Sequence, residues 1–410
     1  MGEQVLNVAV VGAGSFGRNH LRVYRELENA GQGVTLAAVV EPDQARTADH
    51  AARYGIPAFP SVDQMLDADL KIDAATVAVP TIHHHAVAAV LLDAGLDLLV
   101  EKPLAATLSE ADDLIRIAET ARAERGQRIL QPGHLERFNP AVLAVEPKVR
   151  RPMFFEAHRL SVFTPRALDV DVVLDLMIHD LDIVLNFARS PVREVRAVGL
   201  PILSPKVDIA NVRVEFESGC VANFTASRVS TERVRKLRFF EPRQYVSIDY
   251  ARQDLLVIRL DGNLGSAEPA GISSLIQEAI AAGLDPGKLA VLAAALPPEI
   301  LAAVTAGKID AEVMAKIAAT GLIDPAILAK LGHAAAGPAP GLSFVKPEVT
   351  PGEPLRLEIE SFLDSVRTRK RPRVTARQGR DALALALEIQ EKMATHAHRA
   401  GLDDFFLPGG

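Results

Sequence analysis

A glycine-rich turn near the N-terminus constrains the fold more than any other feature of this sequence. The apolar run at residues 8–11 leads directly into GAGSFG at residues 12–17, and residues 18–27 follow with a helical pattern. In such a unit the first glycine permits a tight turn, the second lets the backbone approach a pyrophosphate, and the third lets helix and strand pack closely. The helix start also offers unpaired N–H groups to phosphates. We therefore predict a dinucleotide site, the alternative being a glycine turn without a ligand. The predicted contacts in this turn are Gly12, Gly14, Ser15, Phe16 and Gly17.

An acidic residue follows the second predicted strand. Residues 34–40 (VTLAAVV) form that strand, and Glu41 comes directly after it. A carboxylate at this place can accept hydrogen bonds from the adenosine ribose and repels the 2′-phosphate of NADP. We therefore expect NAD as the cofactor, with NADP left open. If the turn binds nothing, Glu41 is an ordinary solvated residue.

Strands and helices alternate up to about residue 135, which predicts a doubly wound parallel sheet of the Rossmann type. In such sheets ligands bind beyond the carboxyl ends of the strands. We expect the polar residues at these ends to gather on one edge of the sheet. In chain order they are Glu41, Pro80, Thr81, His84, Glu101, Lys102 and His134.

The pattern changes after about residue 150. Six strand-like stretches lie between residues 192 and 260, several of them alternating, and two helices are predicted at residues 355–366 and 376–398. This predicts a mostly antiparallel sheet with one packed and one open face. Since an open sheet face usually needs a cover, we expect a homo-oligomer, a dimer or a tetramer, formed through that face.

An alanine-rich segment with a loose internal repeat interrupts this second region. Its units resemble short helices with N-cap chemistry at their starts. We expect a small helical insertion; an oligomer contact or partner surface is the alternative. The predicted domains are therefore a Rossmann domain at residues 1–135, an α+β substrate and oligomerisation domain at 136–262 and 342–410, and the insertion at 263–341.

Composition excludes several classes of protein. The chain has 410 residues and a formal net charge of −7, so it lacks the basic footprint of a nucleic-acid-binding protein. No apolar run reaches membrane-spanning length, and no signal peptide precedes the first strand. The single cysteine, Cys220, cannot form an internal disulfide. We expect a cytoplasmic protein with no membrane and no nucleic-acid partner.

Three residues could carry out proton and hydride chemistry. Lys102 follows a parallel strand, where an ammonium can polarise a hydroxyl or hold a developing alkoxide, with Glu101 to pair with it or with the cofactor ribose. Asp175 and His179 lie four apart on one predicted helix and share a face, so the carboxylate could orient the imidazole. The alternatives are a solvated lysine and a capping or core histidine.

The run His83-His84-His85 suggests a metal site at first sight. Consecutive histidines on a helix point in different directions and cannot all bind one ion. We expect no metal, and we place these histidines at the cofactor edge.

With these residues the chain resembles the Gfo/Idh/MocA family of NAD(P)-dependent sugar oxidoreductases. The resemblance is carried by residues 12–17, Pro80-Thr81 with the histidines that follow, Glu101-Lys102-Pro103, and the Asp175/His179 pair. It implies an N-terminal Rossmann domain and a C-terminal domain with an open antiparallel sheet. It also implies that Lys102, Asp175 and His179 are the active-site residues.

Two further stretches, residues 133–140 (GHLERFNP) and 174–182 (LDLMIHDLD), are similar to one branch of that family. The branch oxidises the 3-hydroxyl of UDP-N-acetylglucosamine to a ketone, which an aminotransferase converts to an amine for lipid A. The resemblance therefore implies a sugar-nucleotide substrate. A dehydrogenase of another sugar or of inositol, and a non-catalytic NAD-binding regulator, are the alternatives.

The expected reaction moves a hydride from a sugar carbon to NAD⁺. His179, steadied by Asp175, would take the hydroxyl proton while Lys102 stabilises the alkoxide, although these two roles could be exchanged. Arg137 would suit a diphosphate, or else form a salt bridge. The residues expected to line the substrate pocket are His134, Glu136, Arg137 and Asn139.

Overall fold

The computed structural model describes residues 5–120, 127–164, 170–260, 297–298, 300, 311–319 and 342–402. The chain divides into two compact units: Met1–Pro242 with Ser247–Leu255 and Pro347–Gly410, and Arg243–Val246 with Leu256–Lys346. The boundary expected at residue 135 falls inside the first unit. The domain limits given above therefore stay a prediction.

Six parallel strands form the first sheet, in the order β3-β2-β1-β4-β5-β6. The chain moves outward from β1 to β3 and then returns to β4 on the other side of β1. The strand order therefore reverses between β1 and β4, which is where such sheets bind ligands. The strands are β1 (Leu6–Val11), β2 (Val34–Val40), β3 (Ala58–Phe59), β4 (Ala74–Val77), β5 (Asp97–Glu101) and β6 (Leu130–Gly133).

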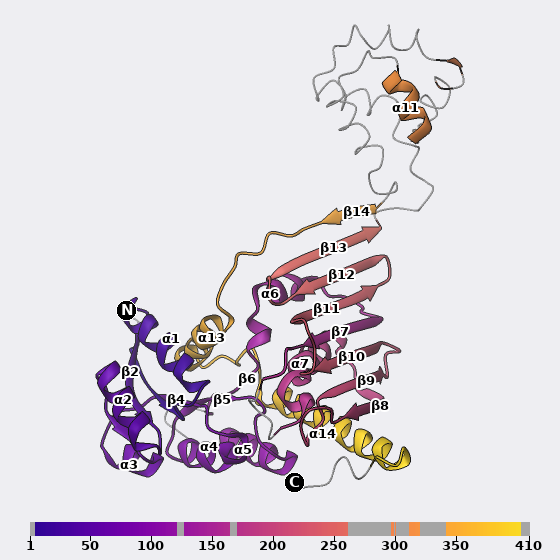
Figure 1. The fold of residues 1–410 in the computed structure, drawn as a ribbon. Coiled ribbons are helices and arrows are strands. Elements are labelled where there is room, and N and C mark those ends of the chain that lie inside the picture. The colour runs from indigo at the N-terminus through magenta and orange to yellow at the C-terminus, as the bar shows by residue number, and fades with distance from the viewer. Residues whose placement is uncertain are drawn as a thin grey trace, which may run out of the picture. The chain divides into compact units, whose positions relative to one another are not determined.

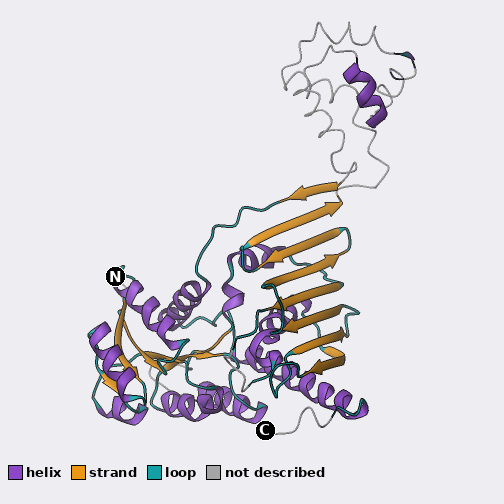
Figure 2. Ribbon diagram, viewed as in Figure 1, coloured by secondary structure: helices purple, strands orange, loops and turns teal. Residues whose placement is uncertain are grey.

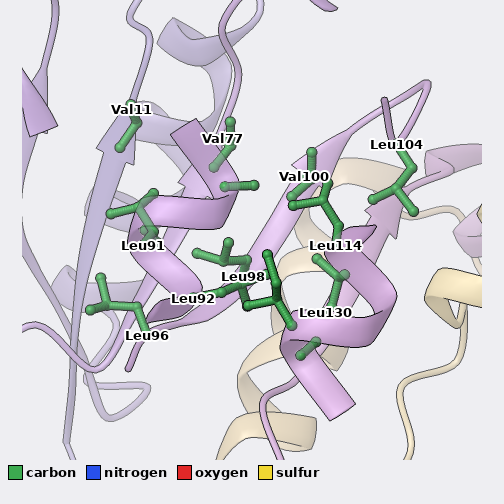
Figure 3. Packing of buried hydrophobic residues seen from close by; sticks show 14 of the residues in the cluster. Val11, Val77, Leu91, Leu92, Leu96, Leu98, Val100, Leu104, Leu114 and Leu130 are labelled. Atoms are coloured by element: carbon green, nitrogen blue, oxygen red, sulfur yellow. The ribbon is translucent and has the colours of Figure 1, made fainter. Parts of the chain in front are cut away.

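Helices cover both faces of this sheet, as Figures 1 and 2 show. Successive residues of β1 explain why the strand is apolar throughout: Val8 and Val10 enter one core, and Ala9 and Val11 enter the other. The first core contains α1 (Gly17–Asn29) and α13 (Pro354–Thr368). The second contains α4 (His84–Asp93) and α5 (Leu108–Thr120), whose leucines pack on Val77 and Val100 in Figure 3. The connections also include α2 (Gln44–Tyr54), α3 (Val62–Asp67), η1 (Thr81–His83), η2 (Leu135–Phe138), α6 (Pro140–Val145) and η3 (Glu146–Lys148).

The second sheet has eight strands in the order β14-β13-β12-β11-β7-β10-β9-β8. Strands β7 and β10 are parallel, whereas the pairs β7–β11, β8–β9, β9–β10 and β13–β14 are antiparallel. The strands are β7 (Phe154–Leu160), β8 (Val192–Leu200), β9 (Ile209–Phe216), β10 (Val221–Ser227), β11 (Val234–Glu241), β12 (Gln244–Asp249), β13 (Asp254–Leu260) and β14 (Leu342–Val345). The predicted fold class, a parallel sheet followed by a mostly antiparallel one, is confirmed.

Helices α7 (Ile178–Ala188) and α14 (Ala376–Arg399) pack on one face of the second sheet. In β7 every second residue is buried beneath them, and the residues between are half exposed. The single helix expected to carry both Asp175 and His179 differs from the structure, because Asp175 lies in the π-helical turn η4 (Val173–Met177) that comes before α7. Such turns are rare and are frequent at functional sites.

Most of the predicted insertion, residues 263–341, lies outside the described residues. Within it the structure describes helix α11 (Ala311–Ala319), which coincides with one unit of the repeat. No helix in the described ranges is both long enough and apolar enough to cross a membrane.

One carboxyl group is buried in the core between the first sheet and α13. Glu358 is 0% exposed, and neither of its oxygens has a hydrogen-bond partner among the described residues. Its helix neighbours Leu355 and Ile359 belong to the apolar core. Burial raises the pKa of Glu358 well above its usual range, and the nearby carboxylates Glu101 and Asp182 raise it further.

We expect Glu358→Gln to stabilise the protein at pH 8 and to have little effect at pH 5. A carboxyl whose folded-state pKa is raised contributes stability at low pH, and that stability is lost as the pH rises through the raised pKa. The neutral amide has no such loss. Thermal unfolding should show a midpoint about 2 °C or more higher for the variant at pH 8.

The matched control is Glu360→Gln on the same helix, because Glu360 is partly exposed and pairs with Arg356 at 2.9 Å. Its effect should not grow between pH 5 and pH 8. An equal shift at both pH values for Glu358→Gln would contradict the prediction.

Candidate active site

The glycine turn lies between β1 and α1. Gly12 has a φ of +89°, and a Cβ there would lie 2.7 Å from the carbonyl oxygen of Ala78. A Cβ on Gly17 would overlap the carbonyl oxygen of Gly12, so the close packing of helix on strand requires this glycine. At Gly14, by contrast, no heavy atom lies within 4 Å of an added Cβ. The fold itself does not require a glycine at this position, and the open space beside the start of α1 fits a pyrophosphate. Ser15 and Phe16 are exposed on the same turn.

Glu41 fastens the glycine turn to the end of β2. One carboxylate oxygen accepts a hydrogen bond from the N–H of Ala13 at 2.9 Å, and the other accepts one from the N–H of Asp43 at 3.2 Å. The half-exposed Arg46 lies 3.2 Å from the same carboxylate. Glu41 is 3% exposed, so its first role is to hold the turn, and its contact with the ribose stays a prediction.

His84 joins the two loops that follow β4 and β5. Its Nδ1 lies 2.8 Å from the carbonyl oxygen of Pro103, and its Nε2 lies 2.9 Å from that of Val79. The ring is buried, which lowers its pKa. Both ring nitrogens are therefore engaged inside the protein, and the geometry gives His84 a positioning role instead of the predicted direct contact with the cofactor. Pro80 is exposed and Thr81 half buried at the surface of this loop.

The neighbouring histidines point elsewhere. His85 Nε2 lies 2.9 Å from the carboxylate of Asp113 on α5, and His83 is exposed. The three rings therefore do not converge, as their spacing predicts. Among the described residues no group of three or more His, Cys, Asp or Glu side chains could hold a metal ion.

Lys102 reaches from the end of β5 to the π-helical turn before α7. Its ammonium donates hydrogen bonds to the carbonyl oxygens of Asp175 at 2.8 Å and Leu174 at 3.3 Å. The Asp175 carboxylate lies 3.9 Å from the same ammonium. Burial lowers the pKa of Lys102, while the carboxylates of Asp175 and Glu101 oppose this shift.

Glu101 turns away from the ammonium that follows it in the chain. One of its oxygens lies 2.7 Å from Nε2 of the buried His20 on α1, and the other accepts the backbone N–H of Lys102 at 3.3 Å. Glu101 therefore orients the backbone of Lys102, and its predicted contact with the cofactor ribose stays a prediction.

His179 lies in the first turn of α7 and is half buried. Burial lowers its pKa well below the usual value, and the positive charges of Lys102, Arg159 and other neighbours lower it further. Its Nδ1 has no hydrogen-bond partner among the described residues. The carboxylate of Asp175 faces Lys102, and within the described ranges no hydrogen bond joins it to His179. The expectation that Asp175 steadies the imidazole therefore stays a prediction, and in this structure its carboxylate lies beside Lys102.

Beneath the site lies a buried ion network that the sequence did not reveal. The guanidinium of Arg159 on β7 donates two hydrogen bonds to Asp180, at 2.7 and 3.0 Å, and one to Glu136 at 2.9 Å. It also lies 5.1 Å from the ring centre of Tyr250. No motif marks Arg159. The sequence gives one indication: Arg159 follows Phe155 and Ala157 at intervals of two residues along the strand, so its side chain lies on the same core-facing side as theirs.

The residues expected to contact substrate are mostly used inside the protein. Glu136 accepts bonds from Arg159 and from Asn139, and Asn139 also caps α6 through Ala141. Arg137 is 2% exposed and lies 3.4 Å from Asp182. Glu136 and Asn139 are thus satisfied structural groups. Nε of Arg137 has no hydrogen-bond partner among the described residues, but its Nη1 pairs with Asp182, which favours the salt bridge over the diphosphate for Arg137.

His134 differs from these three residues. It is fully buried, and both of its ring nitrogens lack partners among the described residues. Burial lowers its pKa as well. His134 and Lys102 both lower the pKa of His179, which places the three groups in one electrostatic neighbourhood. Of the four predicted substrate ligands, His134 is the one whose side-chain nitrogens both lack partners among the described residues.

Comparison with known proteins agrees with this arrangement. Residues 6–126 match the model of an oxidoreductase family with an NAD-binding Rossmann fold, and residues 142–243 match the Gfo/Idh/MocA C-terminal domain. Over 276 residues, 67% of this chain and 82% of the relative, the sequence is 36% identical to UDP-N-acetylglucosamine 3-dehydrogenase of Acidithiobacillus ferrooxidans.

Two other matches show the range of the similarity. A solved structure of the Acidithiobacillus ferrooxidans enzyme is 29% identical, covers 94% of this chain and 97% of its own, and has a TM-score of 0.69. An inositol 2-dehydrogenase of Leifsonia xyli is 32% identical over 197 residues, which is 46% of this chain and 56% of the relative.

The family, the NAD cofactor and the enzyme class expected from the sequence are confirmed by these matches. They agree with the open glycine turn and with the buried lysine and histidine at the edge of the parallel sheet. The chain belongs to the Gfo/Idh/MocA family of NAD-dependent oxidoreductases.

Proposed function

We propose that this protein oxidises the 3-hydroxyl of UDP-N-acetylglucosamine to a ketone, with NAD⁺ as the oxidant. The observation that carries the proposal is a hydrogen-bonded Lys102 ammonium whose charge lowers the pKa of His179, an imidazole whose Nδ1 has no partner among the described residues. The similarity to a UDP-N-acetylglucosamine 3-dehydrogenase over 82% of that relative supports the choice of substrate. The ketone would then be aminated, in a pathway leading to lipid A.

The two groups take complementary roles in the proposed reaction. His179 is neutral because its pKa is depressed, so it can accept the proton of the sugar hydroxyl. Lys102 donates to two carbonyl oxygens, which favours its protonated form, and this ammonium can stabilise the developing alkoxide. The glycine turn after β1 would hold NAD⁺, which would supply the hydride acceptor for the sugar carbon. The products are the ketone, the reduced cofactor and one proton on His179.

Other parts of the proposal concern surroundings and assembly. We propose that His134, with two unsatisfied ring nitrogens, contacts substrate. The partly exposed face of the second sheet supports a homo-oligomer, a dimer or tetramer, formed through that face. One cysteine in 410 residues supports a cytoplasmic location.

The similarity to inositol 2-dehydrogenases makes inositol oxidation the second candidate. The two candidates are separated by one assay with purified protein and NAD⁺, supplied with either UDP-N-acetylglucosamine or myo-inositol. The absorbance of NADH is followed, with an aminotransferase and glutamate present to remove the ketone. A 3-deoxy sugar nucleotide that gives no NADH would fix the position of oxidation.

Removing either reacting group should abolish most of the turnover. We expect Lys102→Ala and His179→Ala each to lower kcat by about 100-fold or more, because each loses a group that acts on the transferring proton or the alkoxide. The control is His158→Gln on the half-exposed face of β7. NADH binding and the unfolding midpoint confirm that the variants are folded. A decrease in kcat of less than tenfold for both alanine variants would contradict this mechanism.

The pH dependence should report the depressed pKa of His179. Only the neutral imidazole accepts a proton, so kcat/KM falls as the pH drops through that pKa. Because the pKa lies below its usual value, the acid limb should lie below about pH 6.5, the value for a free histidine. A profile of kcat/KM between pH 4.5 and 9 measures it. An acid limb at or above pH 7 would contradict the assignment of His179 as the base.

The role of the glycine turn in cofactor binding can be tested without an activity assay. We expect Gly14→Ala to leave the unfolding midpoint of the apoprotein unchanged, because its Cβ meets no atom within 4 Å. The same Cβ would enter the space of the pyrophosphate, so the Kd for NADH should rise about tenfold or more. Gly17→Ala should instead lower the midpoint through its clash with Gly12. If a folded Gly14→Ala protein bound NADH with an unchanged Kd, the pyrophosphate would not bind at this turn.

A further inference from the structure

Strand β11 carries an arginine on the face of the sheet against which α7 packs. In the antiparallel pair of β11 with β7, Arg235 lies directly opposite Arg159, so both side chains are on the same face. Two and four residues further along β11, Leu237 and Phe239 are buried on this face. The ring of Phe239 contacts that of Phe187 on α7 at 5.8 Å. Arg235 therefore projects on the side that holds the active-site helix.

Three permanent cations lower the pKa of His179, namely Lys102, Arg159 and Arg235, and they differ in what they bind. Arg159 is buried and committed to Asp180 and Glu136. Lys102 is committed to the carbonyl oxygens at the π-helical turn. The side chain of Arg235 is exposed and makes no hydrogen bond or ion pair within the described residues. Arg235 is thus the cation near the base that keeps its donors available.

We propose that Arg235 binds the phosphate or diphosphate group of the substrate and so selects a sugar nucleotide over a neutral sugar. This inference rests on the proposed function and names the residue that would enforce it. The guanidinium offers a planar fork of N–H donors that matches phosphate oxygens. A phosphate held by Arg235 would leave the attached sugar next to His179 and Lys102, which neither myo-inositol nor a free sugar could achieve through this contact.

The same contact would adjust the base. The positive charge of Arg235 contributes to the lowered pKa of His179, together with Lys102, Arg159 and His134. A bound phosphate brings negative charge beside Arg235 and offsets part of this field. Substrate binding would therefore raise the basicity of His179 at the moment when a proton must be accepted, and a neutral sugar would not.

The chain supplies a matched control on the same strand. Arg238 lies three residues from Arg235, on the opposite face of β11, and its guanidinium is 3.6 Å from Glu156. Because side chains alternate along a strand, Arg238 points away from α7. Replacing it removes one positive charge from the same strand and should leave the substrate site intact.

The test is calorimetric titration of UDP-N-acetylglucosamine, and separately of UDP, into the full-length protein loaded with NADH. We expect Arg235→Gln to raise the Kd for both ligands about tenfold or more, the size of a lost hydrogen bond between charged groups. Arg235→Lys should fall between wild type and Arg235→Gln, because it keeps the charge and loses the fork. Arg238→Gln should stay within about twofold of wild type.

Three results would overturn the inference: a Kd for Arg235→Gln equal to that of wild type, an equal loss in Arg238→Gln, or no binding of either ligand by the wild type. Failure of the proposed function looks different. In that case UDP-N-acetylglucosamine binds with full dependence on Arg235, while the coupled assay yields no NADH.

A second measurement follows the pKa of His179 directly by NMR. In protein with ¹³C-labelled histidine rings, the His179 signal is assigned by its absence in His179→Gln. Addition of UDP should raise the pKa of His179 in the wild type and change it less in Arg235→Gln. In the ligand-free protein, Arg235→Gln should itself raise that pKa. A His179 pKa that moves with neither change would also overturn the inference.

Discussion

The hydrogen bonds from the Lys102 ammonium to the carbonyl oxygens of Leu174 and Asp175 set the geometry of the active site. They tie the end of a Rossmann strand to the turn that begins the helix of His179. The loop of Lys102 is fixed from its other side by His84, which bonds the carbonyl oxygen of Pro103. Burial lowers the pKa of Lys102, and the carbonyl oxygens act in the opposite direction because they stabilise the charged form. The position of Lys102 relative to the helix of His179 thus depends on the bonds of its own ammonium and on the contact of His84 with Pro103.

The ion network of Arg159, Asp180 and Glu136 supports the same geometry from below. Buried ion pairs add little net stability, since desolvation offsets most of their attraction, and their best-supported role is to specify an arrangement. Here the network fixes the first turn of α7 on β7, so the position of His179 follows from it. It also engages Glu136 of the polar run after β6, so this side chain is used inside the protein.

The elements set by local pattern were predictable from the sequence, including the β1 turn, the parallel sheet and the closing helices. Lys102 and His179 were predictable through a family resemblance. The contact of Asp175 with Lys102 could not be predicted from the sequence. A π-helical turn changes which side chains face one another, and it leaves no mark on the hydrophobic periodicity. Arg159 and Arg235 become visible only when β7 and β11 pair, since strand register is a long-range property.

The cations near His179 link the choice of substrate to the basicity of the imidazole. In the proposed mechanism Lys102 holds the alkoxide, and Arg159 holds the helix of His179, yet the charges of both lower the pKa of the imidazole and make it a weaker base. A neutral substrate would leave this positive field in place. An anionic substrate that reaches Arg235 would reduce it, so binding energy from a group remote from the reacting carbon would improve proton transfer. If Arg235 binds phosphate as proposed, the arrangement of charges would favour a phosphorylated sugar over a neutral one on chemical grounds, independently of the shape of the pocket.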